Sequence, residues 1–269
     1  MSPSAQHLQW SGHTDRGKVR PNNEDAFLTI QFDARELRYL GKIGESAIEH
    51  ADFVFAVSDG MGGAKAGEFA SRIAVDRITH LLPRSYKQSA VGLAAGHADV
   101  LTELFSQIHH AMLHLGYSYQ ECAGMGATLS LCWFTPGWMH FGHVGDSRIY
   151  YLPAGKSSAR QLTHDDTHVG WLHRHGQINE REARTHPRRN VLQKALGAGH
   201  QFVDPQVGSV GYEPGDAFLL CTDGVVDGLY DQRLSEFLCA PEADAPRVVA
   251  AAVENSGRDN TTAIVIRVQ

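Results

Sequence analysis

Short apolar runs near the start of the chain predict β-strands. We expect strands at places bounded by glycine or polar residues: His7–Gly12, Ala26–Ile30, Leu37–Ile43 and Phe53–Asp59. Within the last of these, Val54–Val57 is apolar without alternation, which is typical of a strand buried on both faces.

Apolar residues at three- and four-residue steps then predict two long helices. The segment Gly67–Leu82 has this spacing, and we expect Pro83 to end the helix because proline lacks a backbone N–H. The segment Ala98–Leu115 carries a single apolar stripe along one face, which predicts a second helix of similar length.

Strand patterns return in the second half of the chain. We expect a hairpin of Ala127–Thr135 and Trp138–Leu152 around the turn at Pro136-Gly137, and further strands at Asp216–Asp223 and Thr261–Gln269. Short helices are predicted at Leu234–Leu238 and Pro246–Asn255. Runs of strands followed by runs of helices indicate an α+β fold with antiparallel sheets, rather than strict βαβ alternation.

The segment Leu162–Gly199 differs from the rest of the chain. It is rich in histidine and arginine and weakly periodic, with short helical patterns at Val169–His175 and Asn179–Thr185. We interpret it as an excursion over the surface of the core.

Composition narrows the class of protein. The 269 residues, with 42% hydrophobic and 20% charged, predict one globular domain spanning residues 1–269. The 24 Lys and Arg against 30 Asp and Glu give a net charge of -6, which argues against a general nucleic-acid binder. We see no secretory signal and no apolar run of membrane-spanning length, so we expect no membrane association.

The cysteines indicate the compartment. The chain has 4 of them, none at metal-binding spacing, and this usage is typical of reduced thiols in a cytoplasmic protein. We expect the protein to be monomeric.

The candidate chemistry lies in acidic residues next to predicted strand ends. These are Asp59, Asp146, Asp223 and Asp259, together with the acidic pair Glu24-Asp25 beside a further strand. If these strand ends converge, the carboxylates repel one another, by about 4 kcal/mol for two charges 4 Å apart at an effective dielectric near 20. Such a cluster requires cations.

The types of ligand favour a hard ion. Oxygen ligands without cysteine or a necessary histidine suit Mg²⁺ or Mn²⁺ better than zinc. Two such ions would activate water and neutralise a phosphoryl group, so the pattern indicates metal-assisted phosphate hydrolysis. Glycines beside the aspartates, such as Gly60, allow close backbone approach, and a glycine carbonyl can itself be a ligand.

Other readings of the same residues remain open at this point. Each Asp-Gly on its own usually forms a turn. His110 and His114 have the i, i+4 spacing of two zinc ligands on a helix, but the sequence offers no third ligand, so a surface or core role is favoured for them. The chain has no phosphate-binding loop with its lysine, no H-E-x-x-H and no contiguous EF-type calcium loop. A simple calcium-binding structural domain is therefore disfavoured.

The motifs taken together resemble a known family. They are T-D-R-G-K-V-R-P-N-N-E-D at Thr14–Asp25, V-S-D-G-M-G-G at Val57–Gly63, G-A-T at Gly126–Thr128, G-H-V-G-D-S-R at Gly142–Arg148, C-T-D-G at Cys221–Gly224 and G-R-D-N-T-T at Gly257–Thr262. In this order they resemble the bacterial branch of the metal-dependent protein phosphatases, the type 2C serine/threonine family. The resemblance covers nearly the whole chain.

This resemblance implies a fold and a reaction. The fold would be an αββα sandwich of two antiparallel sheets flanked by helices, with a centre of two Mn²⁺ or Mg²⁺ ions at one end. Asp59 would bridge both metals, the Gly60 carbonyl would bind one of them, and Asp223 and Asp259 would complete the other. A metal-bridging hydroxide would attack the phosphorus of phosphoserine or phosphothreonine without a phosphoenzyme intermediate.

The remaining roles follow from the same resemblance. Glu24 and Asp25 would hold metal-bound waters, and Arg20 would bind the phosphate through its planar fork. Asp146 matches the position of a third, weaker metal site, shared with Asp223. The substrates would be phosphorylated proteins, targets of a Ser/Thr kinase. A phosphoprotein-binding or scaffold module on the same fold is the alternative, against which the intact aspartates argue.

One position departs from the family. Many eukaryotic members have a histidine after the first Asp-Gly, proposed to protonate the leaving oxygen, whereas Met61 stands here. The general acid is therefore unassigned, with a metal-bound water, His173 or His175 as candidates. The Leu162–Gly199 excursion resembles the flap of bacterial members, where Arg188 and Arg189 are candidates to meet an acidic phosphopeptide.

Overall fold

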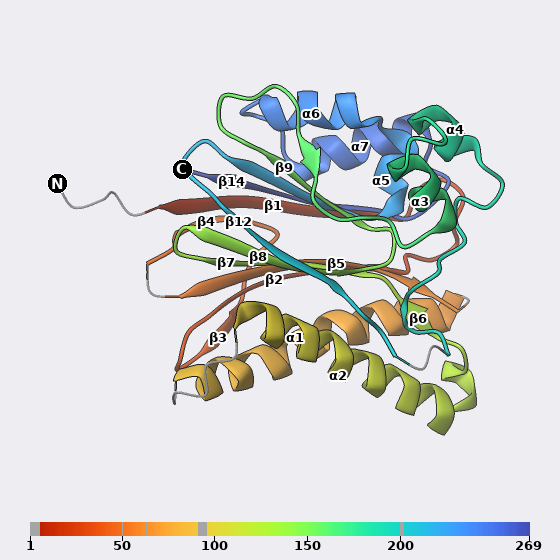
Figure 1. Ribbon diagram of the computed structural model, residues 1–269, viewed down its shortest axis with the longest axis horizontal. Coiled ribbons are helices and arrows are strands. Elements are labelled where there is room, and N and C mark those ends of the chain that lie inside the picture. The colour runs from red at the N-terminus through yellow and green to blue at the C-terminus, as the bar shows by residue number, and fades with distance from the viewer. Residues whose placement is uncertain (1–5, 50, 63, 91–95, 200–201) are drawn as a thin grey trace.

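Two antiparallel sheets stack face to face, and helices cover the outer face of each (Figure 1). The computed structural model describes residues 6–49, 51–62, 64–90, 96–199 and 202–269. The layered arrangement confirms the expected αββα sandwich.

One sheet joins the two ends of the described chain. Its six strands follow the order β10-β9-β13-β14-β1-β4, and every neighbouring pair is antiparallel. The strands are β1 (His7–Asp15), β4 (Ile43–Ala47), β9 (Arg148–Leu152), β10 (Arg160–Gln161), β13 (Ala217–Cys221) and β14 (Thr261–Val268).

The second sheet has eight strands. Its main path is β11-β6-β5-β7-β8-β12, and β2 pairs with both β3 and β5. The strands are β2 (Asp25–Phe32), β3 (Leu37–Tyr39), β5 (Asp52–Met61), β6 (Gly126–Ala127), β7 (Leu129–Thr135), β8 (Trp138–Val144), β11 (Leu196–Gly197) and β12 (Gln206–Gly211).

The helices form the outer layers and one end of the molecule. The pair α1 (Ala64–Ala90) and α2 (His97–Ser118) covers the sheet that contains β5, while α6 (Asp231–Cys239) and α7 (Ala245–Asn255) cover the other sheet (Figure 1). The short helices are η1 (Gln120–Cys122), α3 (His168–Arg174), α4 (Glu180–Thr185) and α5 (Asp223–Gly228). Of these, α3, α4 and α5 lie together at one end of the sandwich (Figure 1).

Alternation along the central strands explains their continuous hydrophobic character. On β5, Phe53, Phe55 and Val57 pack between the two sheets, while Val54 and Ala56 pack against α1 and α2. The corresponding strand β13 divides its side chains in the same way between the inter-sheet core and the layer of α5, α6 and α7. Both strands are buried on both faces, as predicted from their unbroken apolar runs.

Three predicted boundaries are wrong. Helix α1 continues through Pro83 to Ala90, because a proline removes one helical hydrogen bond without making the following turns impossible. Trp138–Leu152 is not one strand. Strand β8 ends at Val144, and after a turn the chain crosses to the other sheet as β9. Leu37–Ile43 is likewise divided between β3 and the start of β4, which belong to different sheets.

Two further observations bear on the expected environment. None of the described helices has both the length and the apolar composition needed to cross a bilayer. All four cysteines are free thiols, and Cys132 and Cys221 are buried packing residues as expected.

Candidate metal centre

Acidic residues from both sheets meet at the end of the sandwich where α5 begins. Asp25 and Asp59 are direct cross-strand partners on β2 and β5. Asp223 is the first residue of α5, immediately after β13, and Asp259 lies just before β14. Asp146 occupies the turn between β8 and β9. The strand ends that carry these aspartates therefore converge, which is the condition under which the sequence indicates a metal site.

The carboxylates influence one another electrostatically. Burial raises the pKa of Asp59 well above its usual value, and the charges of Asp25, Asp223, Asp146 and Asp259 raise it further. The pKa of Asp223 is raised in the same way, by burial first and then by the charges of Asp146 and Asp259. Burial is also the main cause that raises the pKa of Asp25 and of Asp146 to about 7.

Two fully buried oxygens of this cluster have no hydrogen-bond partner among the residues that the structure describes. Asp25 Oδ1 and Asp223 Oδ1 are both buried and unsatisfied. An unpaired buried carboxylate oxygen is costly unless a cation binds it. Within the described residues, no group of three or more acidic, histidine or cysteine side chains is arranged to hold a metal ion as it stands. The donor chemistry, the mutual repulsion and the two unsatisfied oxygens nevertheless fit hard divalent cations.

Threonine residues hold the Asp25 carboxylate and the Asp59 backbone. Thr222 Oγ1 and Thr262 Oγ1 donate to Asp25 Oδ2 over 2.8 and 2.6 Å. Each threonine comes from a different strand end of the six-stranded sheet. Thr128 holds the Asp59 backbone from two sides. The Asp59 N–H donates to Thr128 Oγ1 over 2.9 Å, and the Thr128 N–H donates to the Asp59 carbonyl over 2.8 Å. The hydroxyls thus fix these aspartates while leaving Asp25 Oδ1 free for another ligand.

Glycine is required where the chain segments approach most closely. A Cβ on Gly60 would lie 1.9 Å from the Gly67 carbonyl oxygen, at the start of α1. A Cβ on Gly224 would lie 2.0 Å from the Asn260 carbonyl oxygen. Neither backbone contact could relax without moving the strand ends, so any side chain at these positions would displace Asp59 or Asp223.

Arg20 lies at the rim of the cluster. Its Nη2 donates to Asp259 Oδ2 over 2.6 Å, and its side chain is 47% exposed. This hydrogen bond is the largest cause that raises the Arg20 pKa. The guanidinium is therefore charged, accessible and next to one of the predicted metal ligands.

The loop that carries Arg20 and Glu24 is fastened by Asn260. Asn260 Oδ1 accepts from the Glu24 N–H over 2.7 Å, and its Nδ2 donates to the carbonyls of Arg16 and Asn22 over 2.9 Å each. Glu24 in turn approaches α1, because a Cβ on Gly67 would meet Glu24 Oε2 at 2.4 Å. One buried amide thus joins the N-terminal loop to the start of β14.

A pocket opens beside the cluster. Its walls include Asp146 and Asp223 from the strand ends and residues of the flap, which we define as residues 162–199. Arg189 and His173 line the pocket. Arg188 is exposed outside it, and His175 stacks on Trp171 with ring centroids 4.2 Å apart. The structure therefore places only Arg189 of the two candidate arginines, and only His173 of the two alternative histidines, in the lining of the pocket.

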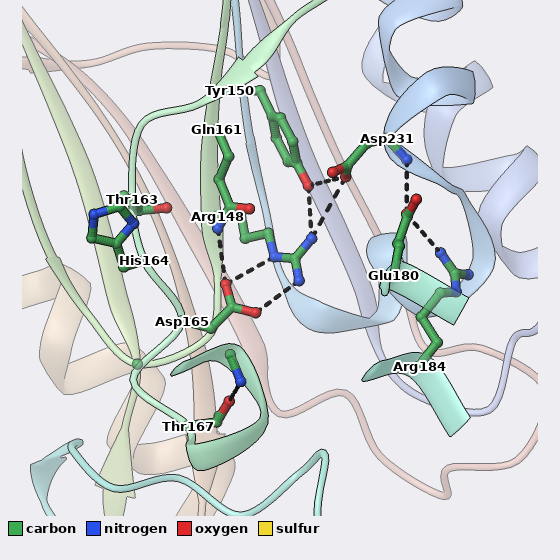
Figure 2. A network of polar contacts seen from close by, with 12 residues as sticks. Arg148, Tyr150, Gln161, Thr163, His164, Asp165, Thr167, Glu180, Arg184 and Asp231 are labelled. Carbon is green, nitrogen blue, oxygen red and sulfur yellow. Dashed lines mark hydrogen bonds and ion pairs between the residues drawn. The ribbon is translucent and has the colours of Figure 1, made fainter. Parts of the chain in front are cut away.

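Ion pairs and hydrogen bonds attach the flap to the core (Figure 2). Arg148 on β9 donates to both oxygens of Asp165, over 2.9 and 2.7 Å. Its Nη1 donates to the Tyr150 hydroxyl, which donates to Asp231 Oδ1 over 2.7 Å. The Asp231 N–H donates to Glu180 Oε1 on α4 over 3.1 Å (Figure 2). This chain of contacts runs from the start of the flap to its second helix.

A second attachment uses Arg184. Its guanidinium donates to the backbone carbonyls of Leu229 and Asp227 over 2.8 and 2.7 Å, and lies 3.9 Å above the Tyr230 ring. Helix α4 is thereby held against the end of α5, the helix that begins with Asp223.

Several residues that support this site have no predicted role. Thr128, Thr222, Asn260 and Thr262 stand inside the quoted motifs, next to the acidic residues. Their position in those motifs was the available signal. The pairing of Arg148 with Asp165 had no such signal, because it joins a motif to a segment of weak periodicity.

Comparisons with known proteins agree with this geometry. The family model described as protein phosphatase 2C matches residues 43–251. The chain is 30% identical over 258 residues to the serine/threonine phosphatase stp of Listeria innocua, covering 94% of this chain and 93% of that protein. It is 32% identical over 263 residues to the serine/threonine protein phosphatase PstP of Mycobacterium tuberculosis, covering 96% of this chain but 44% of that protein's length.

A solved structure that contains metal ions is also similar to this chain. The catalytic domain of PstP in complex with two manganese ions matches with a TM-score of 0.75 and 30% identity, covering 98% of this chain and 99% of that one.

Proposed function

Because the chain belongs to the protein phosphatase 2C family, we propose that it is a metal-dependent phosphatase that hydrolyses phosphoserine and phosphothreonine in proteins. The observation that carries this proposal is the convergence of buried carboxylates from both sheets, with Asp25 Oδ1 and Asp223 Oδ1 unsatisfied. Bound cations would offset the mutual repulsion of the ionised carboxylates in such a cluster.

Two Mn²⁺ or Mg²⁺ ions would be held by Asp59, the Gly60 carbonyl, Asp223 and Asp259. Glu24 and Asp25 would act through water, and Asp146 would contribute to a third, weaker site. When bound, such ions neutralise phosphoryl charge and make a bound water more acidic. The two manganese ions in the PstP complex support a two-metal centre here.

Arg20 would bind the substrate phosphate. Its guanidinium is half exposed and hydrogen-bonded to Asp259, so an arriving phosphate meets a cation that is already oriented at the rim. A planar fork can donate two parallel hydrogen bonds to phosphate oxygens, which fixes the phosphorus for attack.

Water, rather than a side chain, would attack phosphorus, so that no phosphoenzyme forms. Met61 cannot protonate the leaving seryl or threonyl oxygen. His173 supplies one route for that proton because it lines the pocket beside Asp146 and Asp223. Water at the site supplies the other, and His175, outside the pocket lining, is the weaker candidate.

The wider setting follows from the family. We propose phosphorylated targets of a Ser/Thr kinase as substrates, and a monomeric chain that forms a single catalytic domain, since both sheets contribute to one site. Four free cysteines support a cytoplasmic location.

Hydrolysis of p-nitrophenyl phosphate and of a phosphothreonine peptide tests the proposal. We expect turnover with Mn²⁺ or Mg²⁺ that is lost with a chelator and in Asp59→Asn. Tight metal binding without turnover would favour instead a phosphoprotein-binding module on the same fold.

A further inference from the structure

The imidazole of His143 is fixed at the base of the turn that carries Asp146. His143 is completely buried at the end of β8. Its Nε2 lies 3.0 Å from the Gly145 carbonyl oxygen, and its Nδ1 lies 2.8 Å from Ser130 Oγ. A carbonyl oxygen only accepts, so Nε2 carries the proton and Nδ1 accepts from the Ser130 hydroxyl. Ser130 therefore fixes the tautomer that His143 needs to hold Gly145.

Gly145 is held from a second side by Asp166. The Gly145 N–H donates to Asp166 Oδ2 over 3.0 Å, and the Gly145 carbonyl accepts from the Asp166 N–H over 2.7 Å. Gly145 has φ +113°, and a Cβ there would lie 2.6 Å from Thr128 Cβ. Glycine adopts this backbone conformation readily, whereas any side chain at the position would be strained and would collide with Thr128.

Asp166 also belongs to the flap. Its carbonyl accepts from the Gln193 N–H over 2.7 Å, so it joins the two ends of the flap. Its Oδ1 lies 3.9 Å from Lys194 Nζ. The same residue therefore contacts the Asp146 turn on one side and both ends of the flap on the other.

We propose that His143 and Asp166 are positioning residues, together a Gly145 clamp, that orient the Asp146 carboxylate for its metal ion and connect its position to the flap. This inference rests on the proposed function, since it assumes that Asp146 binds a cation. The peptide between Gly145 and Asp146 leads directly to the ligand, and its carbonyl accepts from both members of the clamp. Neither side chain needs to touch the metal or the substrate.

The proposal predicts a loss of metal affinity without loss of fold. Hydrogen bonds that orient a metal ligand typically contribute about 10–100-fold to affinity. We expect His143→Leu to lower the affinity for the most weakly bound Mn²⁺ ion by about ten-fold. In His143→Gln the amide nitrogen stands near the position of Nε2 and keeps the donor, so affinity should stay close to that of the parent. In His143→Asn only the Ser130 side is kept, so affinity should fall as in His143→Leu.

Mn²⁺ binding to the full chain, followed by electron paramagnetic resonance of the free ion, measures these effects apart from activity. Thermal unfolding in a chelator checks that the compared variants are equally folded. His140→Leu, on the same strand but not in contact with Gly145, is the matched control and should bind Mn²⁺ as the parent does. If His143→Leu does not fold, the comparison of His143→Gln with His143→Asn decides.

Coupling to Asp146 completes the test. Asp146→Ala should remove the weakest ion, and adding His143→Leu to it should cause no further loss, because both act on one ligand. Asp166→Ala should lower the affinity for the same ion, whereas Asp166→Asn, which keeps an acceptor for the Gly145 N–H, should not.

Equal Mn²⁺ affinity in the parent, His143→Leu and His143→Asn would overturn the inference while leaving the phosphatase proposal intact. A parent chain that binds no Mn²⁺ and hydrolyses nothing would overturn both.

Discussion

The carboxylate cluster and the flap are held in place by different means. The cluster consists of Glu24, Asp25, Asp59, Asp146, Asp223 and Asp259, which lie at or next to strand ends. Asp25 and Asp59 are cross-strand partners, and buried threonine hydroxyls support both of them. The flap is attached mainly through charged side chains such as Arg148, Arg184 and Asp165. It contributes two short helices and a wall of the pocket.

This difference indicates what each region contributes. The cluster concentrates negative charge where folding alone would disfavour it, which is typical of a site selected for chemistry rather than stability. Apart from β11, which pairs with β6 and places Leu196 in the core, the flap contributes little to the sheets. Reactivity should therefore depend on the cluster, and recognition of the substrate chain should depend on the flap.

Neutralising the cluster should give the largest effect. We expect Asp59→Asn to lower turnover at least about 1,000-fold, since metal coordination is worth several kcal/mol to the transition state. The same change should stabilise the metal-free chain by about 1 kcal/mol, because it removes one repelling charge. Kinetics with Mn²⁺ and thermal unfolding in a chelator measure the two effects. Full activity in this variant would disprove the metal assignment.

The pH dependence of metal-free stability should be the next largest effect. Asp25 and Asp146 have pKa values raised to about 7 from 3.8, so between these values the folded chain retains protons that the unfolded chain has lost. Stability is then greatest below pH 4 and falls as pH rises through 7. Added Mn²⁺ should reverse the trend, because it binds the ionised carboxylates. Chemical unfolding at several pH values, with and without Mn²⁺, checks both; a metal-free curve that rises from pH 4 to 7 would contradict it.

Arg20 lies between the two regions and should affect binding more than chemistry. We expect Arg20→Ala to raise KM about ten-fold or more with a smaller change in kcat, since a hydrogen bond to a charged group contributes about 1.5–3 kcal/mol. Arg20→Lys should raise KM less than Arg20→Ala does but still above the parent value, because an ammonium lacks the planar fork of a guanidinium. Steady-state kinetics on p-nitrophenyl phosphate suffice, and a pure kcat defect would show that Arg20 acts otherwise.

Sequence patterns were sufficient to predict an α+β fold with antiparallel sheets and to identify the acidic residues. The apolar runs of β5 and β13 predict strands buried on both faces, and each ends at an aspartate. The local pattern places Asp59 and Asp223 at strand ends, whereas only the structure shows that both ends lie at the same edge of the sandwich. The resemblance added the αββα layering, the set of metal ligands and the roles of Arg20 and Glu24.

Contacts between distant segments could not be predicted in this way. The break at Gly145 lies inside a stretch whose alternation suits one long strand, and only the opposite sheet determines that the chain crosses over. Arg184 donates to backbone carbonyls, which no side-chain pattern identifies. Pro83 lies within α1 because the helix is stabilised by packing on the sheet rather than by local propensity.

The two adjacent flap arginines offer the smallest and most discriminating prediction. Arg189 lines the pocket, with Nη2 3.8 Å from Asp227 Oδ2, whereas Arg188 is exposed outside it. We expect Arg189→Ala to raise KM for a phosphothreonine peptide about three-fold. An ion pair between Arg189 and an acidic residue of the peptide would be solvent-accessible, and such pairs contribute under about 1 kcal/mol. Arg188→Ala should leave that KM unchanged.

Neither arginine variant should change the kinetics on p-nitrophenyl phosphate, which has no flanking peptide to meet the flap. A specificity role for the flap requires this difference between substrates. If Arg189→Ala slows both substrates equally, the flap contributes to the reacting centre itself, and the division between a reactive cluster and a recognising flap is wrong.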